Sequence, residues 1–137
     1  IIIWFNNSNI TTTIHTNLSS PSGLFVTTAD EILVYSWCPN NRLDRWTFNG
    51  TRLLPSISFS SPCDDLFLTT NNHLYCSQTN QHQIVRRSLT NLLTGTEIVA
   101  GTGCPRFAPD MLSYPTGIFV TTNLDLYVAD SGNDRIQ

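Results

Sequence analysis

An internal repeat restricts the fold of this chain more than any other feature of its sequence. Three stretches of six residues align without gaps, namely GLFVTT at 23–28, DLFLTT at 65–70 and GIFVTT at 117–122. A short polar turn and a second apolar run follow each stretch. Two apolar runs separated by a polar turn are typical of a β-hairpin, so we expect each repeat unit to begin with one.

Each unit continues with a third short apolar run and, in the first two units, a fourth, and no segment shows apolar residues at helical spacing. The units start 42 and then 52 residues apart, counted between Leu24, Leu66 and Ile118. Four short strands with a period of about 40 to 50 residues are typical of a β-propeller blade. The first strands are apolar at successive positions, which favours a sheet that is buried on both of its faces.

These patterns predict an all-β fold, a β-propeller fragment with about two complete four-stranded antiparallel blades and a partial blade at each end. Residues 1–17 are expected to form the last two strands of a preceding blade, and residues 18–60 and 61–111 the two complete blades. Residues 112–137 are expected to start a further, truncated blade. Because a closed ring takes about four to eight blades, we expect a piece of a larger propeller. Its uncovered apolar faces should make the isolated chain associate.

The four cysteines, Cys38, Cys63, Cys76 and Cys104, have spacings that match no compact zinc or redox motif. They are therefore disulfide candidates, and disulfides favour an oxidising compartment. Four cysteines allow three pairings. From their expected positions at the ends of second strands and in the connections between blades, we predict Cys38–Cys63 and Cys76–Cys104.

Acceptor sequons for N-glycosylation begin at four asparagines, Asn6, Asn9, Asn17 and Asn49. Single matches also arise by chance in a chain this rich in Asn, Ser and Thr. Together with the cysteines, the sequons favour an extracellular protein or the ectodomain of a membrane protein that uses the secretory pathway. Asn49 is followed by Gly50, and this pair predicts a type I′ turn at an exposed hairpin tip.

The charge balance argues against a nucleic-acid partner, and the length of the apolar runs argues against a membrane span. Charged residues make up only 12% of the 137 residues, no lysine occurs, and the formal net charge is −3. Arg86-Arg87 is the only adjacent basic pair, and neighbours on a strand point to opposite sides, so we expect no nucleic-acid partner. The longest apolar run, Ile1 to Phe5, is far shorter than the roughly 20 residues of a membrane-spanning helix, so we expect no membrane span in this segment.

The last part of the chain combines two strand motifs. Residues 115–118 read PTGI and residues 127–136 read YVADSGNDRI. This sequence resembles the NHL repeat family, whose motif positions here are Pro115, Gly117, Tyr127, Asp130, Gly132, Asn133 and Arg135. We interpret these positions as structural. Asp130 and Arg135 can form an ion pair across the loop between two strands or bond loop backbone groups, while Gly132 and Asn133 suit positive φ.

The resemblance implies a non-enzymatic propeller scaffold that binds a protein or a small ligand on one face. Four residues at strand ends or in connections are possible contacts, with packing between blades as their alternative role: Tyr35, Trp37, His82 and Tyr114. The second function class is a propeller lyase or lactonase similar to the peptide-amidating lyase, with its metal site in blades outside this chain. RNA binding, a property of some NHL propellers of tripartite-motif proteins, is the third class.

The sequence offers no catalytic, cofactor-binding or metal-binding residue. His15, His73 and His82 occupy different positions in the repeat, so we do not expect them to converge on a metal ion. No nucleophile elbow or Gly-rich phosphate loop occurs either. We therefore predict a binding module that needs no cofactor.

Overall fold

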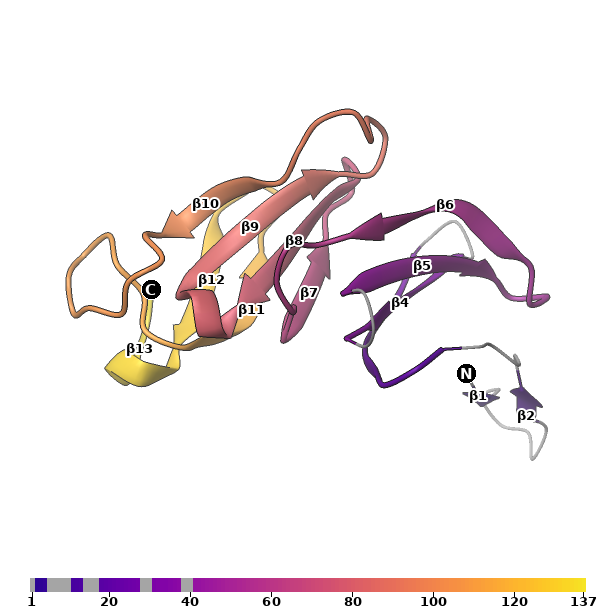
Figure 1. Cartoon of the computed structure of the whole chain (residues 1–137), viewed down its shortest axis with the longest axis horizontal. Coiled ribbons are helices and arrows are strands. Elements are labelled where there is room, and N and C mark those ends of the chain that lie inside the picture. Colours follow the sequence, from indigo (N-terminus) through magenta and orange to yellow (C-terminus); the bar gives the residue numbers. More distant parts are fainter. Residues whose placement is uncertain (1, 5–10, 14–17, 28–30, 38–40) are drawn as a thin grey trace. The chain divides into compact units, whose positions relative to one another are not determined.

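The computed structural model of this chain describes residues 2–4, 11–13, 18–27, 31–37 and 41–137. Figure 1 shows them as a series of β-sheets, and no α-helix occurs among these residues. The strands are β1 (Ile2–Trp4), β2 (Thr11–Thr13), β3 (Pro21–Val26), β4 (Glu31–Ser36), β5 (Arg42–Thr47), β6 (Arg52–Ser58), β7 (Asp65–Leu68), β8 (His73–Gln78), β9 (Gln83–Ser88), β10 (Glu97–Gly101), β11 (Pro115–Val120), β12 (Leu126–Asp130) and β13 (Arg135–Ile136). Two single-turn 3-10 helices, η1 (Thr79–Gln81) and η2 (Ser131–Asn133), follow β8 and β12. In the part of the chain that the structure describes, no helix has the length and apolar character needed to span a membrane.

The strands form antiparallel sheets in the order in which they follow along the chain. The sheets are β1-β2, β3-β4-β5-β6, β7-β8-β9-β10 and β11-β12-β13. The predicted all-β fold with repeated four-stranded sheets is confirmed. Residues 1–58 and 59–137 form two compact units, here called unit 1 and unit 2. Each sheet lies within one of the segments expected from the repeat, and the limits of the blades stay a prediction.

A threonine closes the hairpin after each first strand. The first residue of each repeated Thr-Thr pair donates its backbone N–H to the carbonyl of the residue four positions later and accepts that residue's N–H at Oγ1. The three pairs are Thr27 with Glu31, Thr69 with His73, and Thr121 with Asp125. The side chain thus satisfies a backbone donor that the turn leaves without a ladder partner, which explains why the repeat keeps a threonine there.

The turn between β5 and β6 uses the same arrangement, so the predicted type I′ turn is wrong. The N–H of Thr47 donates to the carbonyl of Thr51 at 2.9 Å, and the N–H of Thr51 donates to Oγ1 of Thr47 at 3.1 Å. Gly50 has a φ of 85°, whereas Asn49 is not among the residues with positive φ. A type I′ turn needs positive φ at both central residues, and the wider turn closed by threonine needs it only at its last residue.

The connection between the second and third strands also recurs. In unit 2 it is a 3-10 turn followed by one left-handed residue, His82 (φ 50°) after η1 and Asp134 (φ 53°) after η2. In unit 1, Asn41 has a φ of 45° immediately before β5. A left-handed residue therefore stands immediately before the third strand in each case, although its identity changes.

The core of unit 2 lies between its two sheets. Tyr75 on β8 and Ile84 on β9 are buried against Ile118 and Val120 of β11 and Val128 of β12. Strand β11 is the element of the last sheet that lies against β7 and β8 (Figure 1). The face of the β7–β10 sheet that carries Tyr75 and Ile84 is therefore covered by the last sheet.

A fully buried carboxylate, Asp44 on β5, is the polar centre of unit 1. Its oxygens accept hydrogen bonds from Nε of Arg42 at 2.9 Å, from Nη2 of Arg52 at 2.6 Å and from Oγ of Ser56 at 2.6 Å. Burial on its own acts to raise the pKa of Asp44, but the hydrogen bonds from Ser56 and Arg52 and the positive charges outweigh it. The pKa of Asp44 is therefore lower than its ordinary value.

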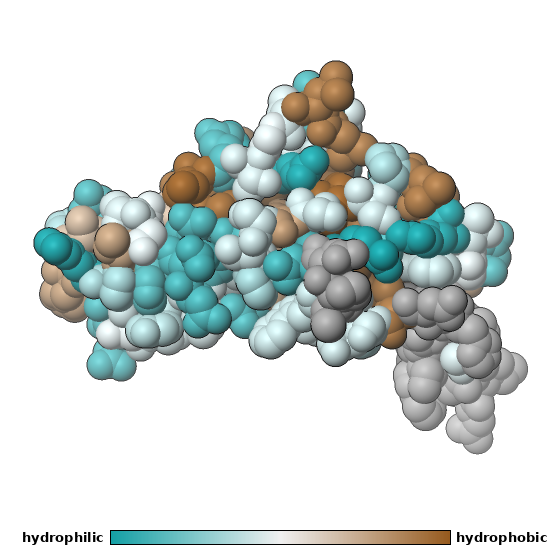
Figure 2. All heavy atoms as spheres, viewed as in Figure 1, coloured by the Kyte–Doolittle hydropathy of each residue, from teal (hydrophilic) through white to brown (hydrophobic). Residues whose placement is uncertain are grey.

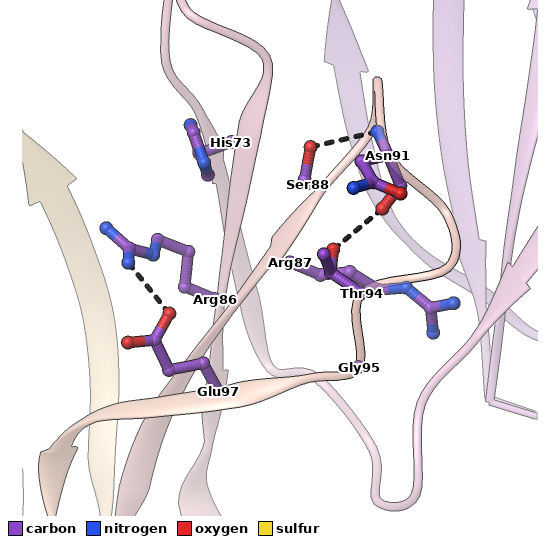
Figure 3. A pocket seen from close by; sticks show the side chains of 8 residues that line it. All are labelled: His73, Arg86, Arg87, Ser88, Asn91, Thr94, Gly95 and Glu97. Atoms are coloured by element: carbon purple, nitrogen blue, oxygen red, sulfur yellow. Dashed lines mark hydrogen bonds and ion pairs between the residues drawn. The ribbon is translucent and has the colours of Figure 1, made fainter.

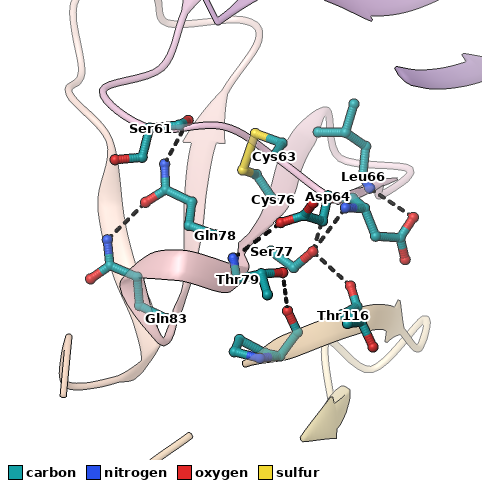
Figure 4. The surroundings of a disulfide bond; sticks show 12 residues. Ser61, Cys63, Asp64, Leu66, Cys76, Ser77, Gln78, Thr79, Gln83 and Thr116 are labelled. Carbon is teal, nitrogen blue, oxygen red and sulfur yellow. Dashed lines mark hydrogen bonds between the residues drawn. A yellow bond between two sulfur atoms is a disulfide. The ribbon is translucent and has the colours of Figure 1, made fainter. Parts of the chain in front are cut away.

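The disulfide of unit 2 joins Cys63 to Cys76, whose Cα atoms are 5.4 Å apart. Figure 4 shows Cys63 in the segment that leads into β7, beside Cys76 on β8. The predicted pairs Cys38–Cys63 and Cys76–Cys104 are therefore wrong, because the antiparallel hairpin places the start of β7 against β8 of the same blade. Cys104 is free and exposed, and Cys38 lies outside the described residues.

Candidate functional site

Three connections meet at one end of unit 2 and form its candidate binding surface. They are residues 79–82 after β8, 102–114 between β10 and β11, and 131–134 after β12. Hydrogen bonds join the second connection to both of the others. Loops held in place by packed sheets are common sites of recognition. We call this surface the loop face of unit 2.

Asp130 is the buried centre of the loop face. Its Oδ1 accepts the N–H of Ser113 at 2.6 Å, and its Oδ2 accepts Nδ2 of Asn133 and Nε of Arg135, both at 2.8 Å. The ion pair predicted between Asp130 and Arg135 is confirmed. Burial acts to raise the pKa of Asp130, but these hydrogen bonds and the arginine charge outweigh it and keep the pKa below its ordinary value.

Arg135 extends this network to the long connection 102–114. Its Nη2 donates to the carbonyl oxygens of Ala108 and Met111, each at 2.7 Å. The guanidinium carbon also lies 4.9 Å from the ring centroid of Phe107, which is 75% exposed. A cation and an aromatic ring attract each other at this distance, so Arg135 restrains the exposed ring of Phe107.

Tyr114 is held more tightly than an exposed side chain usually is. Its backbone has a φ of 46°, which is uncommon for a bulky residue. The N–H of Tyr114 donates to Nδ1 of His82 at 3.1 Å, and the two rings meet edge to face with centroids 4.5 Å apart. His82 is buried, whereas Tyr114 is 51% exposed. Because Nδ1 is an acceptor here, the neutral imidazole carries its proton on Nε2.

Gly132 permits a close approach between two connections. Its N–H donates to the carbonyl of Ser113 at 2.7 Å, and a Cβ at this position would lie 2.5 Å from Oγ of Ser113. The left-handed residue of this turn is Asp134. The expectation that Gly132 and Asn133 adopt positive φ is therefore wrong, since the turn needs space for Ser113 rather than conformational freedom.

Two glutamines take the places of Asp130 and Arg135 in the preceding blade. Gln78 faces Gln83 in the β8–β9 ladder, as Asp130 faces Arg135 in the β12–β13 ladder. Nε2 of Gln83 donates to Oε1 of Gln78 at 2.8 Å, and Nε2 of Gln78 donates to the carbonyl of Ser61 at 3.2 Å (Figure 4). A neutral amide pair thus closes the same connection that an ion pair closes in the last blade.

The four possible contact residues divide into two groups. Tyr35 is fully buried on β4, and His82 is 7% exposed, so neither ring offers a contact surface and both have the alternative role of packing. Trp37 is 45% exposed and Tyr114 is 51% exposed, and both stay candidates. The difference has a local cause. Tyr35 lies within β4 with its side chain on a covered face of the sheet, whereas Trp37 and Tyr114 lie just beyond the ends of strands.

The other residues named from the sequence have mixed positions. Pro115 is buried at the start of β11, a Cβ on Gly117 would lie 3.7 Å from that of Ala129, and Tyr127 is 50% exposed on β12. The sequon residue Asn49 is exposed at the β5–β6 turn. Several of the named residues lie outside the described residues: Asn6, Asn9, His15, Asn17 and Cys38.

An open pocket of about 290 Å³ lies elsewhere in unit 2, beside the β9–β10 loop. Figure 3 shows that Arg86 points toward Glu97, with which it forms an ion pair at 2.7 Å, whereas the side chain of Arg87 extends from the opposite side of β9. The two guanidinium groups therefore do not converge on one ligand. Figure 2 shows hydrophobic side chains gathered over this loop, where Leu93 is 98% exposed.

Sequence reasoning missed Phe107 and the pair formed by Gln78 and Gln83. Nothing in the repeat marks Phe107, because the connection 102–114 has no counterpart of similar length in the other blades. The glutamine pair did carry a signal. Both members of the Asp130–Arg135 position change together in the preceding blade, which is expected when two side chains contact each other.

Comparisons with known proteins agree with this fold. Residues 112–137 match the model of the NHL repeat family. No curated protein sequence matches the chain. Virginiamycin B lyase from Staphylococcus aureus superposes with a TM-score of 0.63 at 18% identity, over 85% of this chain and 36% of the lyase. A chain of the nidogen/laminin complex superposes with a TM-score of 0.69 at 13% identity, over 93% of this chain and 46% of that chain.

The chain therefore has the β-propeller fold and carries an NHL repeat at residues 112–137. It spans between 36% and 46% of the length of these two structures. Likeness at this level of identity concerns the fold alone.

The close approach at Gly132 predicts a specific loss of stability in Gly132→Ala. The added methyl group has to displace Ser113, so we expect the free energy of unfolding to fall by about 1–3 kcal/mol in urea titrations. Gly95→Ala is the matched control, because a Cβ at Gly95 has nothing within 4 Å. Its effect should stay within about 0.5 kcal/mol. Equal effects of the two substitutions would contradict the role of Gly132.

The lowered pKa of Asp130 predicts how the stability of unit 2 depends on pH. The stabilisation is fully present above the ordinary carboxyl pKa of about 3.9 and is lost as the pH falls through the lower folded-state pKa. Asp130→Asn should cost about 3 kcal/mol at pH 7, because it leaves Arg135 without its counter-charge, and should flatten the acid limb of the stability profile. Urea titrations between pH 3 and pH 7 measure both effects, and Asp110→Asn, which removes an exposed carboxylate of the same face, should leave the profile unchanged. An unaltered acid limb in Asp130→Asn would contradict this assignment.

Proposed function

We propose that this chain is a non-enzymatic propeller module of the secretory pathway that binds a protein through the loop face of unit 2. The observation that carries the proposal is the arrangement of Tyr114. The left-handed backbone belongs to the repeat, since Ser20 has a φ of 48° in the same place, but only Tyr114 puts a bulky aromatic side chain there. A buried histidine holds the backbone of Tyr114 while half of the tyrosine surface faces solvent.

The exposed aromatic rings of the loop face have the properties of binding anchors. Tyrosine is enriched among residues that dominate binding energy, and an anchor that is already ordered loses little entropy on binding. Phe107 supplies a second exposed ring in the same connection, and Arg135 restrains it. Two restrained aromatic groups beside polar backbone fit a protein surface better than a small polar ligand.

The buried charged groups support a scaffold role rather than catalysis. Asp44 and Asp130 are both fully buried, and each is engaged by arginine and by further hydrogen-bond donors. Nδ1 of His82 is used by the backbone of Tyr114. Asp130 and His82 hold the connections of the loop face in place, and Asp44 joins β5 to β6. The chain of the nidogen/laminin complex offers a precedent for the same fold within a protein complex.

Two features support the secretory pathway. The disulfide Cys63–Cys76 fits an oxidising compartment. The sequon Asn49-Gly50-Thr51 lies at an exposed turn, where the side-chain carbonyl of Asn49 accepts the N–H of Thr51 at 3.2 Å. An exposed sequon in a turn is accessible to the glycosylation machinery.

The binding proposal predicts that partner retention depends on the ring of Tyr114. The immobilised chain, incubated with an extracellular-matrix extract, should retain proteins that Tyr114→Ala loses by about tenfold or more and that Tyr114→Phe keeps, since the ring supplies most of the contact area. Leu93→Ala is the control, because it removes an apolar side chain, 98% exposed, outside the loop face. Thermal melts establish that all variants are folded. If Tyr114→Ala retains as much protein as the unmodified chain, or if neither retains any, the proposal is overturned.

The secretory proposal predicts a glycan on Asn49. Protein expressed in a eukaryotic secretory host should show a mass increment on the peptide that contains Asn49, and enzymatic deglycosylation should convert this residue to aspartate. Thr51→Ala should abolish the modification, whereas Thr51→Ser should retain it. An unmodified Asn49 in a secreted protein would contradict the proposed accessibility of this turn.

A further inference from the structure

One peptide group on the loop face is held from two sides. The carbonyl of Ser113 accepts the N–H of Gly132 at 2.7 Å. The N–H of the next residue, Tyr114, belongs to the same peptide group and donates to Nδ1 of His82 at 3.1 Å. Gly132 lies in η2, and His82 directly follows η1. The orientation of the Tyr114 backbone therefore depends on one backbone N–H and one histidine nitrogen.

The bond from Tyr114 has no replacement once the imidazole of His82 is protonated. A neutral imidazole has one acceptor nitrogen, whereas a protonated imidazole has two donors and no acceptor. Rotation of the ring does not restore an acceptor, so the N–H of Tyr114 would face a donor or a carbon in every orientation. Protonation of His82 and the bond to Tyr114 therefore exclude each other.

The backbone at this position of the repeat does not by itself require histidine. The left-handed residue before the third strand is Asn41, His82 and Asp134 in the three described blades, and all three residue types are enriched at positive φ. In the connection before β7, Pro62 holds the position of Tyr114, and a proline has no N–H to be bonded. Histidine thus stands where the next connection presents an N–H that needs an acceptor.

His82 is the one histidine of the loop face, and histidine is the side chain that ordinarily changes its charge between pH 5 and pH 8. The ring of Tyr114 contacts it directly. Among the described residues no ion pair includes His82. The other charged or titratable groups on β7 to β10, on the connections of the loop face and on the residues bonded to those connections are Asp64, Asp65, His73, Tyr75, Arg86, Arg87, Glu97, Cys104, Arg106, Asp110, Asp130, Asp134 and Arg135. His73 lies at the opposite end of β8.

We propose that protonation of His82 releases the backbone of Tyr114 and so weakens binding at the loop face. At neutral pH the imidazole accepts the amide, and Tyr114 presents its ring in one orientation. At acidic pH the amide loses its acceptor and the ring gains orientations, so a partner has to order the ring and the affinity falls. The effect on binding rests on the proposed function, whereas the control of Tyr114 by His82 rests on their contact alone.

A pH titration followed by NMR tests this contact without a partner. In the unmodified chain, the backbone amide signal of Tyr114 and the Cε1–H signal of His82 should shift with the same midpoint. His82→Asn should remove the shift of the amide, because Oδ1 of asparagine is bonded to Cγ, as Nδ1 of histidine is, and accepts without titrating. His73→Asn is the matched control and should leave the titration of Tyr114 unchanged. An amide of Tyr114 that stays fixed while His82 titrates disproves the proposal.

Retention of proteins at two pH values tests the consequence for binding. The immobilised unmodified chain, incubated with an extracellular-matrix extract, should retain about fivefold less protein or lower at pH 5.5 than at pH 7.4. Retention by His82→Asn should be the same at both pH values, which also controls for effects of acid on the extract. His73→Asn should lose retention as the unmodified chain does. Thermal melts at both pH values establish which variants are folded.

The two readouts separate the role of His82 from the proposed function. If the unmodified chain keeps its retention at pH 5.5, or if His82→Asn loses it equally, the role of His82 in binding is disproved while the proposed function stands. If nothing is retained at pH 7.4, the proposed function fails, and the NMR titration decides whether His82 controls Tyr114. If His82→Asn does not fold, the titration of the unmodified chain still decides this point.

Discussion

The polar pair between the end of the second strand and the start of the third determines how the loop face of unit 2 is arranged. It is Asp130 with Arg135 in the last blade and Gln78 with Gln83 in the blade before it. One member of each pair also bonds to the backbone of a serine in the connection that leads into the first strand. Because buried polar groups need partners, this one contact fixes three segments of chain at once.

The consequence for the loop face is that its exposed residues rest on buried polar ones. Ser113 is bonded to Asp130, and Tyr114 follows it in the chain with its N–H on His82. Arg135 both neutralises Asp130 and restrains Phe107. The exposed rings are thus positioned by a network that has little contact with solvent, and this separation lets a surface vary while its support stays the same.

Much of this architecture could be predicted from the sequence, because the same pattern of strands and turns occurs three times in it. The alternation of short apolar runs and polar turns predicted the antiparallel four-stranded sheets, and the Asp130–Arg135 ion pair followed from two charged residues flanking a short loop. The disulfide pairing could not be predicted in the same way. Cys63 and Cys76 meet through the register of one hairpin, which the positions of the cysteines along the chain do not reveal.

The errors at Gly132 and Tyr35 have a different cause. The need for a glycine at 132 comes from Ser113 in another connection, and only the folded chain brings the two together. Tyr35 lies near a strand end in the sequence, yet its side chain lies on a covered face of the sheet and is fully buried. A strand end predicts where the backbone emerges, but the direction of a side chain depends on the pleat, and one residue of register reverses it.

In the part of the chain that the structure describes, the disulfide restrains the β7–β10 blade alone. Cys63 occupies the position of the repeat that Pro21 and Pro115 hold, and Cys76 that of Val128. A proline ring and a covalent cross-link both limit the conformations open to the unfolded chain, so each lowers the entropy that folding has to remove. Proline does so in any surroundings, whereas the cross-link exists only after oxidation. The β7–β10 blade therefore gains this restraint only after oxidation, and because β11 packs on that blade, the stability of the last sheet depends on the same step.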